Sequence, residues 1–177
     1  MKKKIHDKTF VPYLSAADIQ QAVSEIASKI NADYQNKSPL CIAILNGSFM
    51  FASDLFKQLE VDASISFIKL ASYKGMNSTG NVVTAIGLEA TLHGRDIILI
   101  EDIVDTGKTL HAFLPQIMDH QPASLKICSL LHKKETTVHP IKIDYLGFEI
   151  PNLFVVGYGL DYDGLGRNLG EIMQLEA

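Results

Sequence analysis

Residues 97–109 constrain the fold of this chain more strongly than any other segment. They consist of an apolar run, three carboxylates and a glycine-centred turn: residues 97–100, then Glu101, Asp102 and Asp105, then Thr106, Gly107, Lys108 and Thr109. After the turn, apolar residues recur at helical spacing, at Leu110, Phe113, Leu114, Ile117 and Met118. The pattern predicts a buried strand whose loop opens a helix, where backbone N–H groups and the helix dipole favour a bound phosphate.

The three carboxylates supply what such a site needs for chemistry. Glu101 and Asp102 form a pair suited to a divalent cation, and Asp105 is suited to accept a proton. Without a ligand or an ion, three carboxylates this close would repel one another, which argues against an ordinary strand–loop–helix with exposed acids. The P-loop of nucleotide hydrolases is also excluded, because it requires a glycine five residues before Gly107 and this chain has Asp102 there.

Length and composition are those of one globular domain. The 177 residues suffice for a proper core, with 47 % hydrophobic and 20 % charged residues. No apolar run approaches the roughly 20 residues of a membrane span, and no apolar signal core follows the basic residues 1–4, so we expect a cytoplasmic protein without membrane contact. A net charge of −4 argues against nucleic acid as the main partner, but not against a phosphorylated substrate.

Helical and strand patterns alternate along the chain. A capping box at residues 15–18 predicts a first helix with an inner face of Ile19, Val23, Ile26 and Ile30. A second helix is predicted after the turn at residues 46–48, with an inner face of Phe49, Ala52, Leu55, Phe56 and Leu59. Further extended segments are predicted at residues 40–45, 63–72, 82–86, 125–132, 145–150 and 154–157. The alternation predicts an α/β fold, a mainly parallel twisted sheet flanked by helices, with ligands at the carboxyl ends of its strands.

Five further positions are candidate parts of a site, each with a plainer alternative. The turn at residues 45–48 is either a second anion loop or an ordinary strand–helix turn. Residues 72–80 are either a lid or a surface loop without a role. Lys133 follows a strand, a place where most lysines are solvated. Residues 154–161 fit core packing as well as ligand binding, and Arg167 fits an ordinary surface position.

The run Glu-Asp-Ile-Val-Asp-Thr-Gly-Lys-Thr at residues 101–109 closely resembles the phosphoribosyl pyrophosphate (PRPP) signature of the type I phosphoribosyltransferases, and within them the hypoxanthine-guanine branch. The further candidate positions extend the resemblance over most of the chain. It implies the type I phosphoribosyltransferase fold as a single domain, residues 1–177, with a small hood formed by the N-terminal segment and residues from about 150 to 177.

The resemblance implies a set of residues that bind PRPP. They are Leu45, Asn46, Gly47, Ser72, Tyr73, Glu101, Asp102, Asp105, Thr106, Gly107, Lys108, Thr109 and Arg167. In the family the peptide between the residues matching Leu45 and Asn46 is often cis. Lysine is common where this chain has Asn46, a departure that removes a cation near the pyrophosphate. Metal binding is implied for Glu101 and Asp102 at a first Mg²⁺, and for Asp161 at a second.

For the purine, the resemblance implies four contacts and one catalytic residue. Lys133 is expected to donate to the exocyclic oxygen of a 6-oxopurine, which disfavours adenine because adenine carries an amino group there. Phe154 is expected to stack on the base, while Val155 and Asp161 approach its edge through their backbone. Asp105 is expected to act as the general base for the purine N7 proton.

The activity implied by the resemblance belongs to purine salvage. The 5-phosphoribosyl group of PRPP would pass to hypoxanthine and guanine, giving IMP or GMP and pyrophosphate, with Mg²⁺ as cofactor and a homodimer or homotetramer as the assembly. Two alternatives stay open. One is a phosphoribosyltransferase that prefers xanthine, because backbone groups read the purine 2-position. The other is a non-catalytic regulator on the same fold that binds RNA or a nucleotide. Such a regulator should have a basic face, and the pI of about 5.8 disfavours one.

Overall fold

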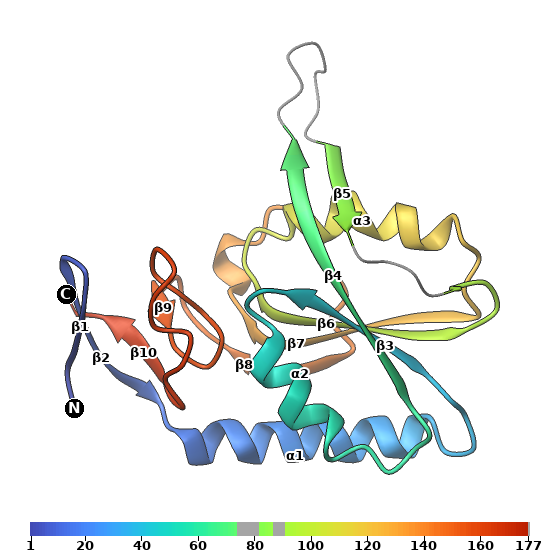
Figure 1. Ribbon diagram of the computed structural model, residues 1–177, viewed down its shortest axis with the longest axis horizontal. Helices are drawn as coiled ribbons and strands as arrows, with labels where there is room; N and C mark the ends of the chain where they lie inside the picture. Colours follow the sequence, from blue (N-terminus) through green and yellow to red (C-terminus); the bar gives the residue numbers. More distant parts are fainter. Residues whose placement is uncertain (74–81, 87–90, 177) are drawn as a thin grey trace.

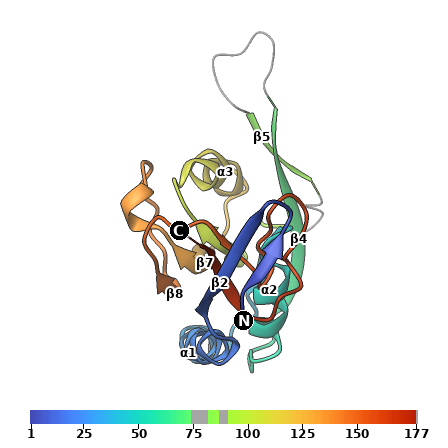
Figure 2. The same cartoon turned by 90° about the vertical axis from the view of Figure 1, so that its left-hand side faces the viewer.

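The computed structural model describes residues 1–73, 82–86 and 91–176, and within them the larger of two sheets has the strand order β5-β4-β3-β6-β7-β8 (Figures 1 and 2). Its strands are β3 (Leu40–Leu45), β4 (Ser64–Tyr73), β5 (Val82–Ile86), β6 (Asp96–Val104), β7 (Ser124–His132) and β8 (Tyr145–Glu149). Every neighbouring pair is parallel except β4 with β5. The mainly parallel sheet expected from the sequence is therefore confirmed.

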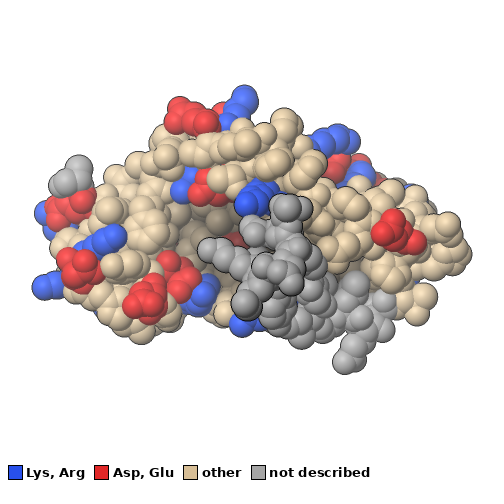
Figure 3. Space-filling model, turned by 90° about the horizontal axis from the view of Figure 1, so that it is seen from above, with Lys and Arg blue, Asp and Glu red and all other residues tan. Residues whose placement is uncertain are grey.

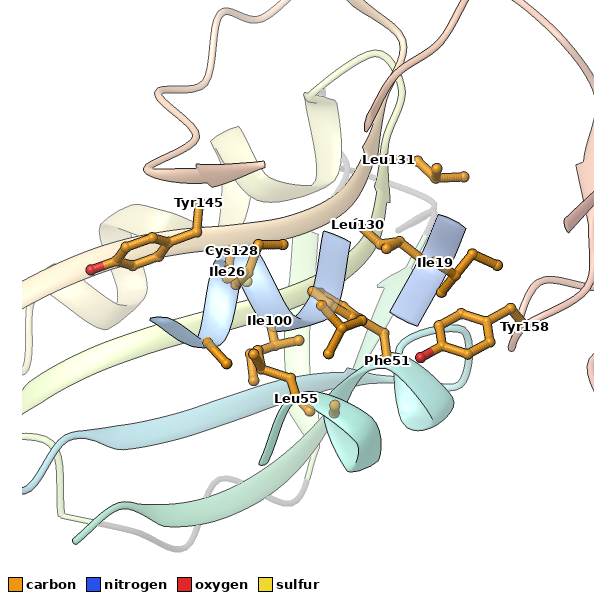
Figure 4. Packing of buried hydrophobic residues seen from close by; sticks show 14 of the residues in the cluster. Ile19, Ile26, Phe51, Leu55, Ile100, Cys128, Leu130, Leu131, Tyr145 and Tyr158 are labelled. Atoms are coloured by element: carbon orange, nitrogen blue, oxygen red, sulfur yellow. The ribbon is translucent and has the colours of Figure 1, made fainter. Parts of the chain in front are cut away.

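Helices cover both faces of this sheet, and strand residues alternate between them. Cys41 and Ala43 of β3 pack in one cluster with α1 (Ala16–Asp33) and α2 (Phe49–Phe56). Their neighbours Leu40, Ile42 and Ile44 pack in a second cluster with α3 (Lys108–Met118). Because both faces are covered, the inner strands read as continuous apolar runs in the sequence. Figure 1 shows α1 and α3 on opposite sides of the sheet, and Figure 4 shows the first cluster from close by.

The helices follow the predicted pattern except at two apolar residues. Ser15 caps α1 through the expected capping box, and Ile19, Val23, Ile26 and Ile30 are buried. In α2, however, Phe49 is 41 % exposed and Phe51 is fully buried. Both residues fit a helical stripe that contains Ala52 and Leu55, so spacing alone selects the wrong one. In α3, Met118 is 53 % exposed because it is the last residue of the helix, beyond the buried Ile117.

Two predicted strand boundaries are corrected by the structure. β6 does not end with its apolar run but continues through Glu101 and Asp102 to Val104, because pairing with β7 persists as far as Val104 opposite His132. The strand predicted at residues 154–157 shrinks to β9 (Val155–Val156), since Gly157 has a φ of +100° that interrupts extended backbone.

A second, smaller sheet joins the two ends of the described chain. Its order is β1 (Lys3–Ile5), β2 (Lys8–Leu14), β10 (Ile172–Leu175) and β9, with every pair antiparallel. Ile5, Phe10, Val156 and Met173 form its own buried cluster. The small sheet lies at one end of the larger one in Figure 1, with both termini beside it. None of the helices in the described ranges is long and apolar enough to cross a membrane.

The difference between Phe49 and Phe51 gives a matched test of the core. We expect Phe51→Ala to lower the free energy of unfolding by about 3–5 kcal/mol, because it leaves a cavity between α1, α2 and the sheet. Phe49→Ala should change it by less than about 1 kcal/mol, since that residue is 41 % exposed and lies outside the buried cluster. Urea denaturation of both variants measures the difference, and equal losses would contradict the observed orientation of α2.

Candidate active site

Neighbouring parallel strands bring the turn after β3 next to the carboxylates of β6. A Cβ atom added at Gly47 would lie 1.6 Å from Asp102 Oδ2, so only glycine fits against this carboxylate. The cis peptide expected from the family is present between Leu45 and Asn46. The Ser48 hydroxyl is buried and donates to Ile44 O at 2.6 Å, which ties the turn back to β3. The turn is therefore a fixed part of the site.

A loop from the small sheet closes onto the same turn. Gly159 has a φ of +101°, and a Cβ atom there would lie 2.0 Å from the carbonyl oxygen of Gly47. The preceding Tyr158 is buried, and its hydroxyl donates to Asp54 Oδ2 of α2 at 2.7 Å. Asp102 of β6 and the loop that contains Gly159 thus meet at Gly47, and Tyr158 ties this loop to α2. Seen from above in Figure 3, the molecule is hollowed between its two parts, with an acidic side chain visible inside.

Arg167 and Asp161 form an ion pair beside this convergence. Arg167 Nη2 lies 2.7 Å from Asp161 Oδ1, and Nη1 donates to Gly159 O at 2.7 Å. The other carboxylate oxygen of Asp161 accepts from the Gly164 N–H at 2.7 Å. The charges of both side chains reach Asp102, whose pKa Arg167 lowers and Asp161 raises. Both predicted residues therefore lie at the site, where Asp161 neutralises the guanidinium.

Glu101 and Asp102 are carboxylates in an unfavourable environment. Burial, and next the charge of Asp102, raises the pKa of Glu101 well above its ordinary value. Its Oε2 is buried and has no hydrogen-bond partner in the described part of the chain. Burial also raises the pKa of Asp102 to about 6, although backbone N–H groups and Arg167 oppose the change. Removing a carboxylate from water without a compensating charge costs free energy, so a cation bound to this pair would be stabilising.

A divalent cation fits the chemistry of these groups. Mg²⁺ binds negatively charged oxygen ligands, commonly one or two carboxylates together with oxygens of a phosphorylated substrate. Among the described residues no three His, Cys, Asp or Glu side chains gather into a protein-only metal site. Glu101 and Asp102 also have different neighbours, since Glu101 lines a cavity with residues 103–110 while Asp102 touches Gly47.

That cavity, of about 90 Å³, lies at the start of α3. Gly107 precedes the helix with a φ of +75°, and a Cβ atom there would lie 2.2 Å from His139 O, so glycine is required. Thr106 Oγ1 accepts from the Lys108 N–H at 3.3 Å, and Thr106 O accepts from the N–H groups of residues 138 and 139. The backbone N–H groups and the dipole of a helix start favour an anion, so this cavity is suited to a phosphate group.

Asp105 and Lys133 lie together at the ends of β6 and β7. Val104 is opposite His132, and the backbone N–H of Lys133 donates to Val104 O at 2.9 Å. In this register the next two side chains meet, with Lys133 Nζ 3.1 Å from Asp105 Oδ2. Lys133 is only 7 % exposed, so it is not the solvated lysine that its position after a strand suggested.

The carboxylate of Asp105 has a second hydrogen-bond donor. Thr136 Oγ1 donates to Oδ1, opposite the oxygen that Lys133 contacts. Partial burial alone would raise the pKa of Asp105, but the hydrogen bonds from Thr136 and Lys133 and the charge of Lys133 bring it below its ordinary value. Asp105 is therefore ionised at neutral pH and accepts hydrogen bonds through both oxygens.

Phe154 and Val155 differ in their surroundings. Phe154 is 42 % exposed, so its ring is available to a ligand and is not part of the core. It packs against Tyr162 at 5.6 Å between ring centroids, and Lys8 Nζ lies 5.3 Å from its centroid. Val155 is buried against the larger core, as ordinary packing predicts. Ser72 and Tyr73 end β4, and the rest of the candidate lid, residues 74–80, lies outside the described residues.

Some residues of the site carried too little signal to be selected from the sequence. Thr136 lies in a short 3-10 turn after β7, where nothing marks one threonine over the next. Lys8 and Tyr162 reach Phe154 from segments far apart in the chain. In the sequence, Gly159 is one of two glycines that flank Tyr158. Its role depends on contact with the turn at Gly47, which the sequence does not show.

Comparisons with known proteins place the fold and the site in one family. A sequence model of the phosphoribosyl transferase domain matches residues 13–163, and the chain belongs to this family. The hypoxanthine-guanine phosphoribosyltransferase of Lactococcus lactis is 39 % identical over 171 residues, 96 % of this chain and 93 % of that protein. The hypoxanthine-guanine-xanthine phosphoribosyltransferase of Tritrichomonas foetus is 37 % identical over 153 residues, 86 % and 84 % of the two chains.

A solved structure agrees with these sequence comparisons. The crystal structure of a hypoxanthine phosphoribosyltransferase from Staphylococcus aureus has a TM-score of 0.88 and 38 % identity to this chain, covering 94 % of it and 91 % of the other. The fold is that of the type I phosphoribosyltransferases. The resemblance inferred from residues 101–109 is therefore confirmed for the family.

The raised pKa of Asp102 predicts a cost in stability that depends on pH. Its pKa is about 6 in the folded protein against 3.8 ordinarily, so the unfolded chain ionises this group more easily. Stability is lost as pH rises from about 4 through about 6. We expect Asp102→Asn to raise the free energy of unfolding at pH 8, without metal, by roughly 1–3 kcal/mol, and the gain to vanish near pH 4.

Urea denaturation between pH 4 and pH 8 in EDTA measures this effect. Asp62→Asn is the matched control, because Asp62 is exposed and should show no comparable gain. A destabilised Asp102→Asn variant at pH 8 would contradict the electrostatic description of the site.

Proposed function

We propose that this protein is a hypoxanthine-guanine phosphoribosyltransferase of purine salvage. It transfers the 5-phosphoribosyl group of PRPP to hypoxanthine or guanine and releases pyrophosphate together with IMP or GMP. The observation that carries this proposal is the Lys133–Asp105 pair, 3.1 Å apart, beside an anion cavity. A 6-oxopurine presents O6 and N7 on one edge, and a donor next to an acceptor matches O6 and a protonated N7.

PRPP occupies the edge of the sheet where the turn with Gly47 meets the loop with Gly159. The start of α3, Asp105 to Thr109, holds the 5′-phosphate, since these residues line the cavity at a helix start, where backbone N–H groups favour an anion. Pyrophosphate lies against the turn of Leu45, Asn46 and Gly47, with Ser72, Tyr73 and Arg167 around it. To reach this anion Arg167 would exchange its contact with one oxygen of Asp161 for a phosphate, which can accept from the guanidinium through two oxygens.

Mg²⁺ is the cofactor in this proposal. Glu101 and Asp102 would hold a first ion together with PRPP oxygens, and Asp161 would meet a second. When bound, the metal offsets the negative charge of the departing pyrophosphate. A cation at this place is supported by the raised pKa of Asp102 and by the buried Oε2 of Glu101, which has no hydrogen-bond partner among the described residues.

The purine lies between the small sheet and Lys133. Phe154 stacks on its face with the ring surface that the fold leaves exposed, and the backbone of Val155 and Asp161 reads its edge. Lys133 donates to O6, and Asp105 accepts the N7 proton as positive charge develops at the ribose C1. The small sheet is the hood of a single domain in this account, and closure of the site excludes water that would hydrolyse the sugar.

Further features of the proposal follow from the family. A homodimer or homotetramer in the cytoplasm is the expected form. A preference for xanthine is the nearest alternative, because a relative that is 37 % identical is named for hypoxanthine, guanine and xanthine together. A non-catalytic regulator is disfavoured by the purine-facing set of Lys133, Asp105 and Phe154.

Product formation from PRPP and Mg²⁺ tests the proposal directly. Hypoxanthine, guanine, xanthine and adenine are assayed in parallel, each with and without EDTA. Metal-dependent turnover of hypoxanthine and guanine with adenine inert is the expected result. Faster turnover of xanthine would select that alternative, and binding of PRPP without turnover of any purine would overturn the enzymatic function.

Removing the proposed general base should slow turnover without loss of PRPP binding. We expect Asp105→Asn to lower kcat by roughly 10²- to 10⁴-fold, because an amide cannot accept the N7 proton. Binding of PRPP, measured by calorimetry, should persist, since the N–H groups of the loop remain. Near-normal turnover would remove Asp105 from this role.

Lys133 and its neighbour Lys134 provide a matched pair for purine selectivity. Lys133→Ala should weaken the use of hypoxanthine by about 1–3 kcal/mol in kcat/KM, the effect of one lost hydrogen bond to a charged group, and should reduce discrimination against adenine. Lys134 is exposed and pairs with Glu149, so Lys134→Ala should leave selectivity intact. Unchanged discrimination in Lys133→Ala would contradict the assignment.

A further inference from the structure

The carboxylate of Asp105 is held at both oxygens, by Lys133 and by Thr136, and we expect only Lys133 to move during the reaction. Lys133 Nζ contacts Oδ2 at 3.1 Å, and Thr136 Oγ1 contacts Oδ1. In the proposed reaction Lys133 moves to the purine O6, which frees Oδ2 for the proton on N7. The proposed reaction assigns no purine contact to Thr136, so its hydroxyl can remain on Oδ1.

The Thr136 hydroxyl has two possible acceptors, and charge decides between them. Its oxygen lies within hydrogen-bond distance of Asp105 Oδ1 and also 3.1 Å from Lys133 O. An ionised carboxylate is an acceptor only and a stronger one than a neutral carbonyl, so the single hydroxyl proton lies toward Asp105. The 3-10 turn Lys134–Thr136 holds the hydroxyl in place, because Thr136 N–H donates to Lys133 O at 3.2 Å.

We propose that Thr136 is a positioning residue that fixes the plane of the Asp105 carboxylate while Lys133 leaves it for the purine. The last torsion of an aspartate is broad and roughly two-fold, so a carboxylate held at one oxygen needs a partner at the other to stay aligned. The inference rests on the proposed function, since it assigns a proton to Oδ2 of Asp105. In the described structure, the charged side chain that pairs with Asp105 is Lys133. The nearest carboxylates before Asp105 in the sequence are Glu101 and Asp102, on β6.

The neighbouring Thr137 offers an internal control. Thr137 follows the same turn, and its hydroxyl contacts Asp105 O at 3.1 Å, Lys133 O at 3.0 Å and His132 Nε2 at 3.1 Å, and not the carboxylate. Thr137→Val therefore removes one hydroxyl from the turn without touching the proton acceptor. Thr136→Val and Thr136→Ser change the same residue, and only the serine variant keeps a hydroxyl that can donate to Asp105.

Steady-state kinetics across pH test the proposal. We expect Thr136→Val to lower kcat roughly 10-fold through misalignment, and to move the acidic limb of kcat/KM for hypoxanthine to higher pH because the carboxylate loses a donor. The KM for PRPP should not change. Thr136→Ser should restore both quantities, and Thr137→Val should retain the kcat and the acidic limb of the wild type. Circular dichroism confirms that each variant is folded.

Three results would overturn this role for Thr136. They are a wild-type kcat and pH profile in Thr136→Val, an equal loss in Thr137→Val, and a failure of Thr136→Ser to rescue. A wild type that transfers no phosphoribosyl group would overturn the proposed function instead. Even then, carbon-13 NMR titration of the Asp105 carboxyl tests the contact itself, because the pKa should rise in Thr136→Val and not in Thr137→Val.

Discussion

The register between β6 and β7 is the constraint on which the rest of the site depends. Val104 lies opposite His132, and this pairing alone makes Asp105 and Lys133 neighbours although 28 residues separate them in the chain. A slip of one residue would turn the side chains of one strand to the other face and separate the acceptor from its donor. Buried apolar residues on both faces oppose such a slip, because Ile100 and Cys128 belong to one cluster while Leu99 and Ile127 belong to the other.

The site concentrates groups that do not stabilise the folded chain by themselves. Glu101 and Asp102 are partly buried and have raised pKa values, and among the described residues Arg167 forms its ion pair with Asp161. A phosphorylated substrate with its cation would supply charges of both signs to these groups, so binding energy offsets the cost of keeping them buried. The glycines at positions 47 and 159 serve the same end, since any side chain there would occupy the space between Asp102 and the two loops.

Much of the fold and part of the site were predictable from the sequence, for physical reasons. Local signals select α1, because a capping box and an apolar stripe agree, and they select the start of α3, because Gly107 and the apolar spacing after it agree. They do not select Phe51 over Phe49, since both fit the stripe and only contact with α1 decides. The length of β6 depends on its partner strand, and the role of Thr136 depends on a carboxylate on another strand. Exposure of Phe154 likewise follows from how the small sheet docks.

The central claim is that Lys133 and Asp105 part to read the O6 and N7 edge of a 6-oxopurine. A crystal structure of the protein with bound IMP tests it most directly. We expect Lys133 Nζ within hydrogen-bond distance of O6 and an oxygen of Asp105 within hydrogen-bond distance of N7, with the phosphate at the start of α3. An intact Lys133–Asp105 pair, with the base bound away from both side chains, would contradict it.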